Sequence, residues 1–327
     1  MGNLIWDYQI ISFLTVGVIA FFLILKNIKE RKLFDSKKTK RKKYLLAGFA
    51  LLFTITVFYG SFIEPRLIIV NEVDINIGKT DLHESLKIVH ISDLHAGPYK
   101  KTGYYERLSR RINELQPDLV VITGDHIYRK EESAIYLKGL EGTSNVYPTY
   151  AITGNHEYNL GLQEDYFDDK LIDKTTVLKK VFEKIGIQTL ENQGLLLHTK
   201  NGQVHLSGIQ EIWSQPEHVE NQLRKMAKKT SNETPKILLS HNPDVINATN
   251  SSYFDIILSG HTHGGQIRLP IIGSIASLPT ELGRKFDRGL FELNEDTKLY
   301  INQGIGEAGP RARLFCPPEI TVLTIDL

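Results

Sequence analysis

The chain has 327 residues, 41% of them hydrophobic and 24% charged, a balance that suits a folded protein and excludes a disordered one. Its single cysteine, Cys316, excludes an internal disulfide framework and a cysteine-rich zinc module. The formal net charge of +1 hides a split, because residues 1–63 hold ten Lys and Arg against three Asp and Glu, which leaves 29 against 35 for residues 64–327. We therefore expect no nucleic-acid-binding body.

Two apolar segments open the chain. Ile10–Leu25 is free of charge, and Tyr44–Ile63 is a run of twenty uncharged residues. Because a helix needs about 20 apolar residues to cross the hydrocarbon core, residues 1–63 are predicted to form a transmembrane helical hairpin. A signal peptide is the alternative for the first segment, but Asp7 and no Lys or Arg precedes it. A buried helical pair would show a polar face, which neither segment has.

All ten cations of this region lie in residues 26–43, between the two segments. The positive-inside rule places such a short loop in the cytoplasm. The sequence therefore predicts a multi-pass protein of the cell membrane, with residues 64–327 outside the cytoplasm. Only Glu64, Pro65 and Arg66 separate the second apolar segment from the first predicted strand. Three residues reach about 10 Å, so we expect the body to stay close to the membrane.

Residues 64–327 are predicted to form one layered α/β domain, because short apolar runs alternate with helical patterns. Apolar spacing indicates helices at Tyr104–Leu115 and Thr176–Ile185. The acidic segment 163–173 lacks the pattern of a calcium loop and is expected to be a solvated insertion. Strands are expected at Leu67–Val73, Lys87–Ser92, Leu119–Thr123, Thr149–Thr153, Val204–Ser207, Ile237–Ser240, Ile256–Ser259, Leu299–Asn302 and Ile320–Ile325.

Five of these strands share a pattern at their carboxyl ends. Each ends in Ser or Thr, and a metal-competent side chain follows directly or after one glycine. The side chains concerned are Asp93, His95, Asp125, Asn155, His156, His241, His261 and His263. Ligands of α/β sheets gather at the carboxyl ends of strands, and Asp and His suit Mn, Fe, Zn or similar ions. One such motif alone is weak, but five in register predict a metal site. The remaining histidines are expected in the core or on the surface.

The motifs resemble those of the calcineurin-like metallophosphoesterases. They occur in the order of that family, as Asp93-X-His95, Gly124-Asp125, Gly154-Asn155-His156-Glu157, His241 and Gly260-His261-X-His263. Residues 264–270 and 304–320 are similar to a branch of membrane-associated bacterial phosphodiesterases, which includes UDP-2,3-diacylglucosamine hydrolases and cell-wall-associated members. The resemblance covers about residues 67–327 and implies a four-layer α/β/β/α sandwich that holds two divalent metal ions.

The resemblance also implies roles for single residues. One ion would be held by Asp93, His95 and His263, and the other by Asn155, His241 and His261. The Asp125 carboxylate would bridge them, and His156 would be the general acid. Many relatives carry an acidic residue where this chain has Tyr128, and an aliphatic residue where it has His126. These departures leave open which residues surround the bridging Asp125 carboxylate and which metal the site prefers.

The residue types suit phosphate chemistry. The charges of two divalent ions, two carboxylates and a bridging hydroxide sum to about +1, and this positive charge attracts a phosphate anion. The bridging hydroxide can then attack the phosphorus in line with the leaving group. His156 can protonate the leaving alkoxide. Glu157 is expected either to orient that imidazole or to be a surface carboxylate. Arg311 and Arg313 are candidates for contact with a substrate phosphate, with ordinary solvated arginines as the alternative.

The sequence thus predicts a membrane-anchored, metal-dependent hydrolase of phosphate esters. Its substrate would be a phosphodiester or pyrophosphate, lipid-linked or linked to the cell envelope. The alternative is a phosphomonoesterase that acts on phosphoproteins or small molecules, because Gly-Asn-His-Glu also occurs in phosphoprotein phosphatases. A nuclease is disfavoured by the acidic body. A non-catalytic scaffold would have lost ligands, and none is missing here. Oligomeric state stays open.

Overall fold

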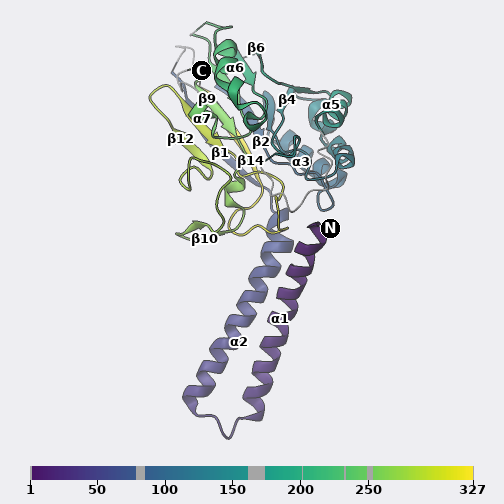
Figure 1. Cartoon of the computed structure of the whole chain (residues 1–327), viewed down its shortest axis with the longest axis vertical. Coiled ribbons are helices and arrows are strands. Elements are labelled where there is room, and N and C mark those ends of the chain that lie inside the picture. Colours follow the sequence, from purple (N-terminus) through teal and green to yellow (C-terminus); the bar gives the residue numbers. More distant parts are fainter. Residues whose placement is uncertain are drawn as a thin grey trace.

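The computed structural model describes residues 2–78, 85–160, 174–200, 202–231, 233–248 and 253–326. The predicted acidic insertion at 163–173 and His83 lie outside these residues. Two long helices project from an α/β body that holds the rest of the chain (Figure 1). They are α1 (Gly2–Glu30) and α2 (Lys37–Phe58), and α2 continues through a π-helical turn (η1, Tyr59–Ile63) and a 3₁₀ turn (η2, Glu64–Arg66).

The two helices pack against each other as a hairpin. Gly17 lets them approach closely, since a Cβ there would lie 2.2 Å from Thr54 Oγ1. Phe13 packs edge-on against Phe53, with 6.1 Å between ring centroids. Most other apolar side chains face outward, and Phe22 and Phe49 are 62% and 69% exposed. Both helices are long and apolar enough to cross a membrane.

The end of the hairpin is docked on the body. The Arg313 backbone N–H donates to the Gly60 carbonyl at 2.8 Å. Glu64 is buried, and its Oε1 accepts a 2.6 Å hydrogen bond from the Cys316 backbone N–H. The short link expected between helix and body is therefore a hydrogen-bonded joint.

Two six-stranded sheets form the centre of the body. The first contains, in order, β1 (Ile69–Asn76), β14 (Glu319–Asp326), β2 (Ser85–Ile91), β3 (Leu119–Thr123), β4 (Thr149–Ile152) and β5 (Ile187–Thr189). The second contains β12 (Gly289–Glu292), β13 (Lys298–Ile301), β9 (Ile256–Ser259), β8 (Lys236–Leu239), β7 (Gly202–Gly208) and β6 (Gln193–Thr199). Each of the nine predicted strands overlaps one of these.

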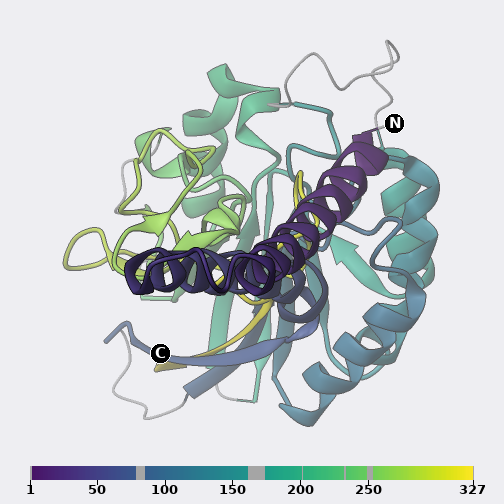
Figure 2. The ribbon, with the colours of Figure 1, turned by 90° about the horizontal axis from the view of Figure 1, so that it is seen from below.

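Helices cover the outer faces of both sheets (Figure 2). α3 (Thr102–Glu114) and α5 (Thr175–Lys184) share an apolar cluster with β2, β3 and β4. α6 (Val219–Ala227) and α7 (Val245–Ala248) share another with β8 and β9. A third cluster fills the space between the sheets. The predicted four-layer α/β fold is confirmed.

Burial on both faces explains why the central strands are continuously apolar. In β3, Val121 faces the cluster between the sheets, whereas Val120 and Ile122 face α3 and α5. The strands β2, β3 and β4 run parallel, as do β8 and β9. Their carboxyl ends therefore meet at one edge of the sandwich.

Candidate metal centre

The residues that follow these five strand ends turn sharply into one buried cluster. Asp93, Asp125 and His261 have φ angles of 52°, 52° and 70°, in the left-handed region, which bends the chain out of the strand direction. Gly260 makes room for this approach, because a Cβ there would lie 2.4 Å from Asp93 Oδ2. The loops are thus shaped around the side chains they carry.

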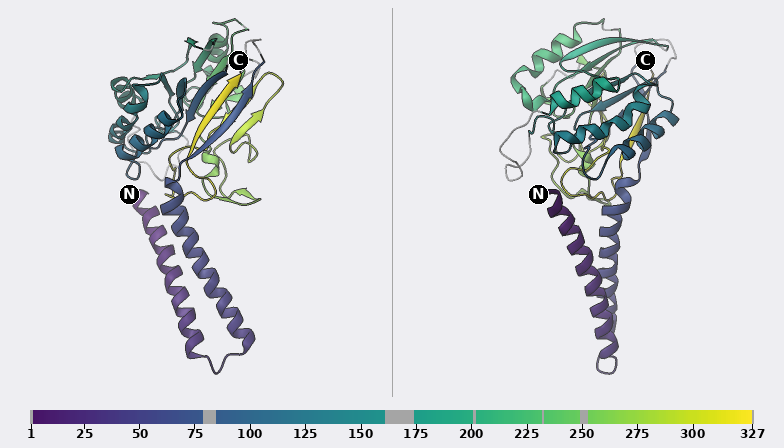
Figure 3. Two further views of the ribbon diagram at one scale, coloured as in Figure 1. Left: turned by 180° about the vertical axis from the view of Figure 1, so that it is seen from behind. Right: turned by 90° about the vertical axis from the view of Figure 1, so that its right-hand side faces the viewer.

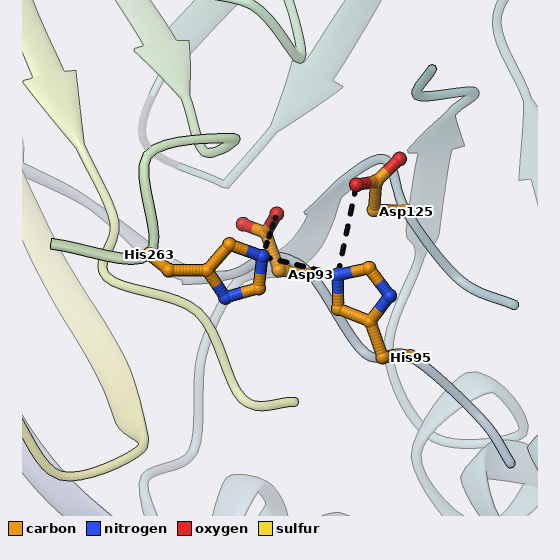
Figure 4. A group of neighbouring side chains, drawn as sticks. All are labelled: Asp93, His95, Asp125 and His263. Atoms are coloured by element: carbon orange, nitrogen blue, oxygen red, sulfur yellow. Dashed lines mark hydrogen bonds and ion pairs between the residues drawn. The ribbon is translucent and has the colours of Figure 1, made fainter. Parts of the chain in front are cut away.

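A first group consists of Asp93, His95, Asp125 and His263 (Figure 4). The Nε2 atoms of His95 and His263 face each other at 3.1 Å. His263 Nε2 lies 3.4 Å from Asp93 Oδ1, and His95 Nε2 lies 3.6 Å from Asp125 Oδ2. Two strand-end loops of the first sheet and one of the second meet here.

A second group consists of Asp125, His241 and His261. His241 Nε2 lies 3.3 Å from Asp125 Oδ2 and 3.1 Å from His261 Nδ1. The amide oxygen of Asn155 is 3.1 Å from the same Nε2 atom. The structure therefore brings all seven predicted ligands together, and Asp125 belongs to both groups.

The donor atoms fit divalent ions. Ligands that bind one ion at about 2.1 Å lie roughly 3.0–3.4 Å from one another, and the spacings above are close to this. Burial lowers the pKa of His95 and His263 well below the usual range, and burial together with His241 lowers that of His261 to about 3. A neutral imidazole keeps one nitrogen lone pair free for a metal ion, so these lowered pKa values favour the binding of a cation over the binding of a proton.

The carboxylates and imidazoles are held in place by the backbone. His241 Nδ1 lies 2.7 Å from the Thr123 carbonyl, to which it donates, so that Nε2 faces the cluster. The His261 N–H donates to both oxygens of Asp93, at 3.2 and 3.1 Å. Burial alone would raise the pKa of Asp125, but His241, whose own pKa is raised well above the usual range by Asp125 despite burial, holds the pKa of Asp125 well below its usual range.

His156 lies beside the cluster with one ring nitrogen engaged. Its Nδ1 is 2.9 Å from the Tyr128 carbonyl, and its Nε2 is 3.8 Å from Asp125 Oδ2. Its backbone N–H donates to Asp125 Oδ1 at 2.9 Å. The Tyr128 ring stacks on the imidazole. The backbone carbonyl at position 128, rather than the Tyr128 side chain noted in the sequence as a departure, thus fixes which nitrogen of His156 faces the centre.

Residues 86–265 match the model of the calcineurin-like phosphoesterases. This chain belongs to that family. It is accordingly a metal-dependent phosphoesterase, as the sequence predicted.

Curated relatives share most of the chain. A metallophosphoesterase of Campylobacter jejuni, itself uncharacterized, is 32% identical over 258 residues, which cover 78% of this chain and 63% of the relative. UDP-2,3-diacylglucosamine pyrophosphatase LpxG of Chlamydia muridarum is 30% identical, with 82% of this chain and 92% of that protein covered. Phosphodiesterase YaeI of Escherichia coli is 27% identical, with 87% and 98% covered. The predicted resemblance to bacterial phosphodiesterases and UDP-2,3-diacylglucosamine hydrolases is confirmed in these relatives.

Glu157 of the phosphoesterase neither orients the His156 imidazole nor lies on the surface, the two roles expected from the sequence. It is fully buried, and the His156 ring nitrogens face the Tyr128 carbonyl and Asp125 instead. Its two oxygens accept backbone N–H groups at 2.9–3.1 Å from Asp125, His126, Ile127 and Gly154. The carboxylate therefore ties the loop after β3 to the loop after β4, which carry the shared ligand and His156.

The two candidate arginines differ in their surroundings. Arg313 is fully buried, and its guanidinium donates to the carbonyls of Gln303, Gly304, Gly306 and Cys316. These donors are committed to the chain, so the expectation that Arg313 contacts a substrate phosphate is corrected. Arg311 lines a small pocket next to His95, with its guanidinium 4.6 Å above the Tyr99 ring.

Other buried polar residues surround the second group. Trp213 packs edge-on against His261, with 4.9 Å between ring centroids. Glu211 is buried, one of its oxygens has no partner among the described residues, and burial raises its pKa to about 7. His90 and His126 lie in the core, where burial lowers the pKa of His90 to about 3. Neither joins the cluster, as expected.

Proposed function

We propose that this phosphoesterase binds two divalent metal ions and hydrolyses a phosphodiester or pyrophosphate bond. Asp93, His95 and His263 would hold one ion, and Asn155, His241 and His261 the other. The observation that carries the proposal is that one oxygen, Asp125 Oδ2, lies 3.6 Å from His95 Nε2 and 3.3 Å from His241 Nε2. When bound, two such ions supply a water of lowered pKa and positive charge for the developing phosphorane-like transition state.

His156 would act as the general acid. The Tyr128 carbonyl accepts from Nδ1, which leaves Nε2 directed toward the cluster. A proton on Nε2 can pass to the oxygen of the leaving group, a contribution of about 10²–10⁴-fold in rate. The ligand set of nitrogen and carboxylate oxygen suits manganese, iron or zinc, and metal reconstitution decides among them.

Residues 1–63 would cross the membrane twice, and residues 64–327 would form the phosphoesterase domain outside the cytoplasm. Support comes from the cations confined to residues 26–43 and from the position of the N-terminal end of α1 next to the body (Figure 1). Protease added to cells stripped of their wall should digest the body and spare the 26–43 loop. A body that is digested only after lysis would reverse this orientation.

The substrate would be a phosphate ester carried by a lipid at the membrane surface. One relative is named for a diacylated sugar nucleotide, and the docked joint at Glu64 holds the body beside the proposed membrane spans. Phosphomonoesterase activity on a phosphoprotein or small molecule is the second candidate, and a non-catalytic scaffold is the third.

The test uses the full-length protein in detergent, stripped of metal with a chelator and then supplied with manganese, zinc or ferrous iron. We expect metal-dependent turnover of bis(p-nitrophenyl) phosphate and of UDP-2,3-diacylglucosamine, with p-nitrophenyl phosphate a poorer substrate. His156→Ala should bind metal normally and lose at least about 10²-fold in kcat. A preference for the monoester would favour the second candidate, and metal binding without any turnover would favour the scaffold.

A further inference from the structure

A short hairpin next to the metal centre exposes apolar side chains at its tip. It is formed by β10 (Arg268–Leu269) and β11 (Gly273–Ser274), which pair antiparallel. Ile271 is fully exposed, and Ile272 is 65% exposed. Ile271 also has a φ of 71°, a conformation that β-branched residues adopt at a cost. Neither packing within the described chain nor turn chemistry accounts for an isoleucine here.

Three neighbours extend this surface. Phe315, Ile275 and Leu269 are 54%, 53% and 39% exposed. Together with Ile271 and Ile272 they form what we call the apolar hairpin surface. Leu269, Ile271, Ile272 and Phe315 line one groove, whereas the other exposed large apolar residues described beyond residue 69 do not line it; these are Ile135, Val146, Leu196 and Leu290. Single exposed apolar residues are ordinary, whereas a contiguous group marks a site of interaction.

The hairpin is fixed beside the end of the helical hairpin. The Arg268 N–H donates to the Leu314 carbonyl at 2.9 Å, and the preceding residue, Arg313, donates its N–H to the Gly60 carbonyl at 2.8 Å. Two backbone hydrogen bonds thus connect β10 with the end of α2. In Figures 1 and 3, β10 lies at the foot of the body, level with the adjoining ends of α1 and α2.

Cations accompany the apolar residues. A groove of about 370 Å³ runs between the hairpin tip and Arg268, Arg284 and Arg288. Among the described residues that line it, Asp287 is the one acidic residue, and it is paired with Arg268. Arg284 and the adjacent Lys285 are exposed. Apolar side chains next to basic ones match the chemistry of acyl chains beneath phosphate headgroups.

We propose that the apolar hairpin surface inserts into the outer leaflet of the membrane that α1 and α2 cross, while Arg284 and Lys285 meet lipid phosphates. The inference rests on the proposed membrane spans and adds a second contact that fixes how the body stands on the bilayer. The segment from His263 leads directly into β10, so this contact would hold the metal centre at a set height above the lipid surface.

The proposal is tested by spin labels on the full-length protein in vesicles of phosphatidylcholine and phosphatidylglycerol. Single cysteines replace Ile271, Ile272, Phe49 or Val146, and labelled wild type gives the background of buried Cys316. Phe49 lies on α2, and Val146 precedes β4 at the end of the strands opposite the metal centre. Collisions with oxygen report lipid, and collisions with a water-soluble nickel chelate report water.

We expect the labels at 271, 272 and 49 to meet oxygen more than nickel, and the label at 146 to show the reverse. If 49 reports lipid while 271 and 272 report water, the inserted hairpin is wrong and the membrane spans stand. If 49 reports water, both are wrong. Labels at 271 and 272 shielded from both reagents would indicate a protein partner or a second copy, which also contradicts the proposal.

A double substitution at the hairpin tip gives a second test. Ile271→Ser combined with Ile272→Ser should leave hydrolysis of bis(p-nitrophenyl) phosphate within twofold of wild type, because these residues do not touch the metal cluster. Its α1 and α2 are unchanged, so it should still reconstitute into vesicles, but a label at residue 275 should lose its lipid-like signal. A loss of soluble-substrate activity above tenfold would mean that the tip packs against the body, which contradicts the proposal.

Discussion

The Tyr99 hydroxyl donates a 2.8 Å hydrogen bond to Asp7 Oδ2, which connects α1 with the loop that follows the first metal-binding motif. Arg311 lies over the Tyr99 ring at 4.6 Å and over the Phe62 ring at 4.8 Å. Its Nε atom is 3.9 Å from Asp7 Oδ1. The first helix therefore places a carboxylate beside the one candidate arginine that lines a pocket with His95.

This arrangement predicts that Asp7 weakens the attraction of Arg311 for a phosphate. Asp7→Asn should lower KM for bis(p-nitrophenyl) phosphate about two- to fivefold, the range of a partly exposed ion pair of about 0.4–1 kcal/mol. Steady-state kinetics in detergent measure it. Tyr99→Phe keeps the Asp7 charge and should leave KM at the wild-type value. Arg311→Ala should raise KM. An unchanged or higher KM in Asp7→Asn contradicts the assignment of Arg311.

Glu157 is predicted to hold the metal-binding loops together. Glu157→Gln replaces one acceptor oxygen by an NH₂ group that faces backbone N–H donors, so part of the tie between the loops is lost. Metal affinity should fall about 10–100-fold, as for other residues that orient ligands. Calorimetric titration of metal-stripped protein measures the affinity. Glu183→Gln, on the exposed face of α5, is the matched control. Equal affinity in both variants would contradict this role.

Glu211 is predicted to make the stability of metal-free protein depend on pH. Burial raises its pKa from 4.5 to about 7, so the folded state binds this proton more tightly than the unfolded state. The contribution is complete below pH 4.5 and is lost as the pH rises through 7, in total about 3 kcal/mol. Denaturant unfolding between pH 4.5 and 7.5 should show a smaller decline in Glu211→Gln than in wild type. Equal declines would contradict this prediction.

Buried strands could be predicted from the sequence, and most edge strands could not. Leu119–Thr123 and Ile256–Ser259 match β3 and β9 residue for residue, because burial on both faces makes the whole run apolar. β6 and β12 lie at the edges of the second sheet and are only half-buried, so their mixed sequences carry no such signal. The two-residue strands β10 and β11 are too short for any periodicity.

The candidate ligands could be predicted because each follows a strand, and topology then brings strand ends together. The roles of Glu157 and Arg313 could not. Both depend on backbone groups of distant segments, and a sequence motif does not reveal where backbone donors and acceptors point. A carboxylate that follows the proposed general acid His156 in the sequence is equally compatible with a surface position or with the buried hydrogen bonds to two loops that Glu157 forms.

The proposed bridge at Asp125 is tested most directly by the number of metal ions bound per chain. Elemental analysis of the purified full-length protein, after reconstitution and removal of free metal, should give two ions for wild type and two for His156→Ala. Asp125→Ala should bind neither ion tightly, because its carboxylate is shared by both groups. Circular dichroism of the same samples checks that each variant is folded. A folded Asp125→Ala variant that retains two ions, or a wild type that binds only one, would contradict the dinuclear centre.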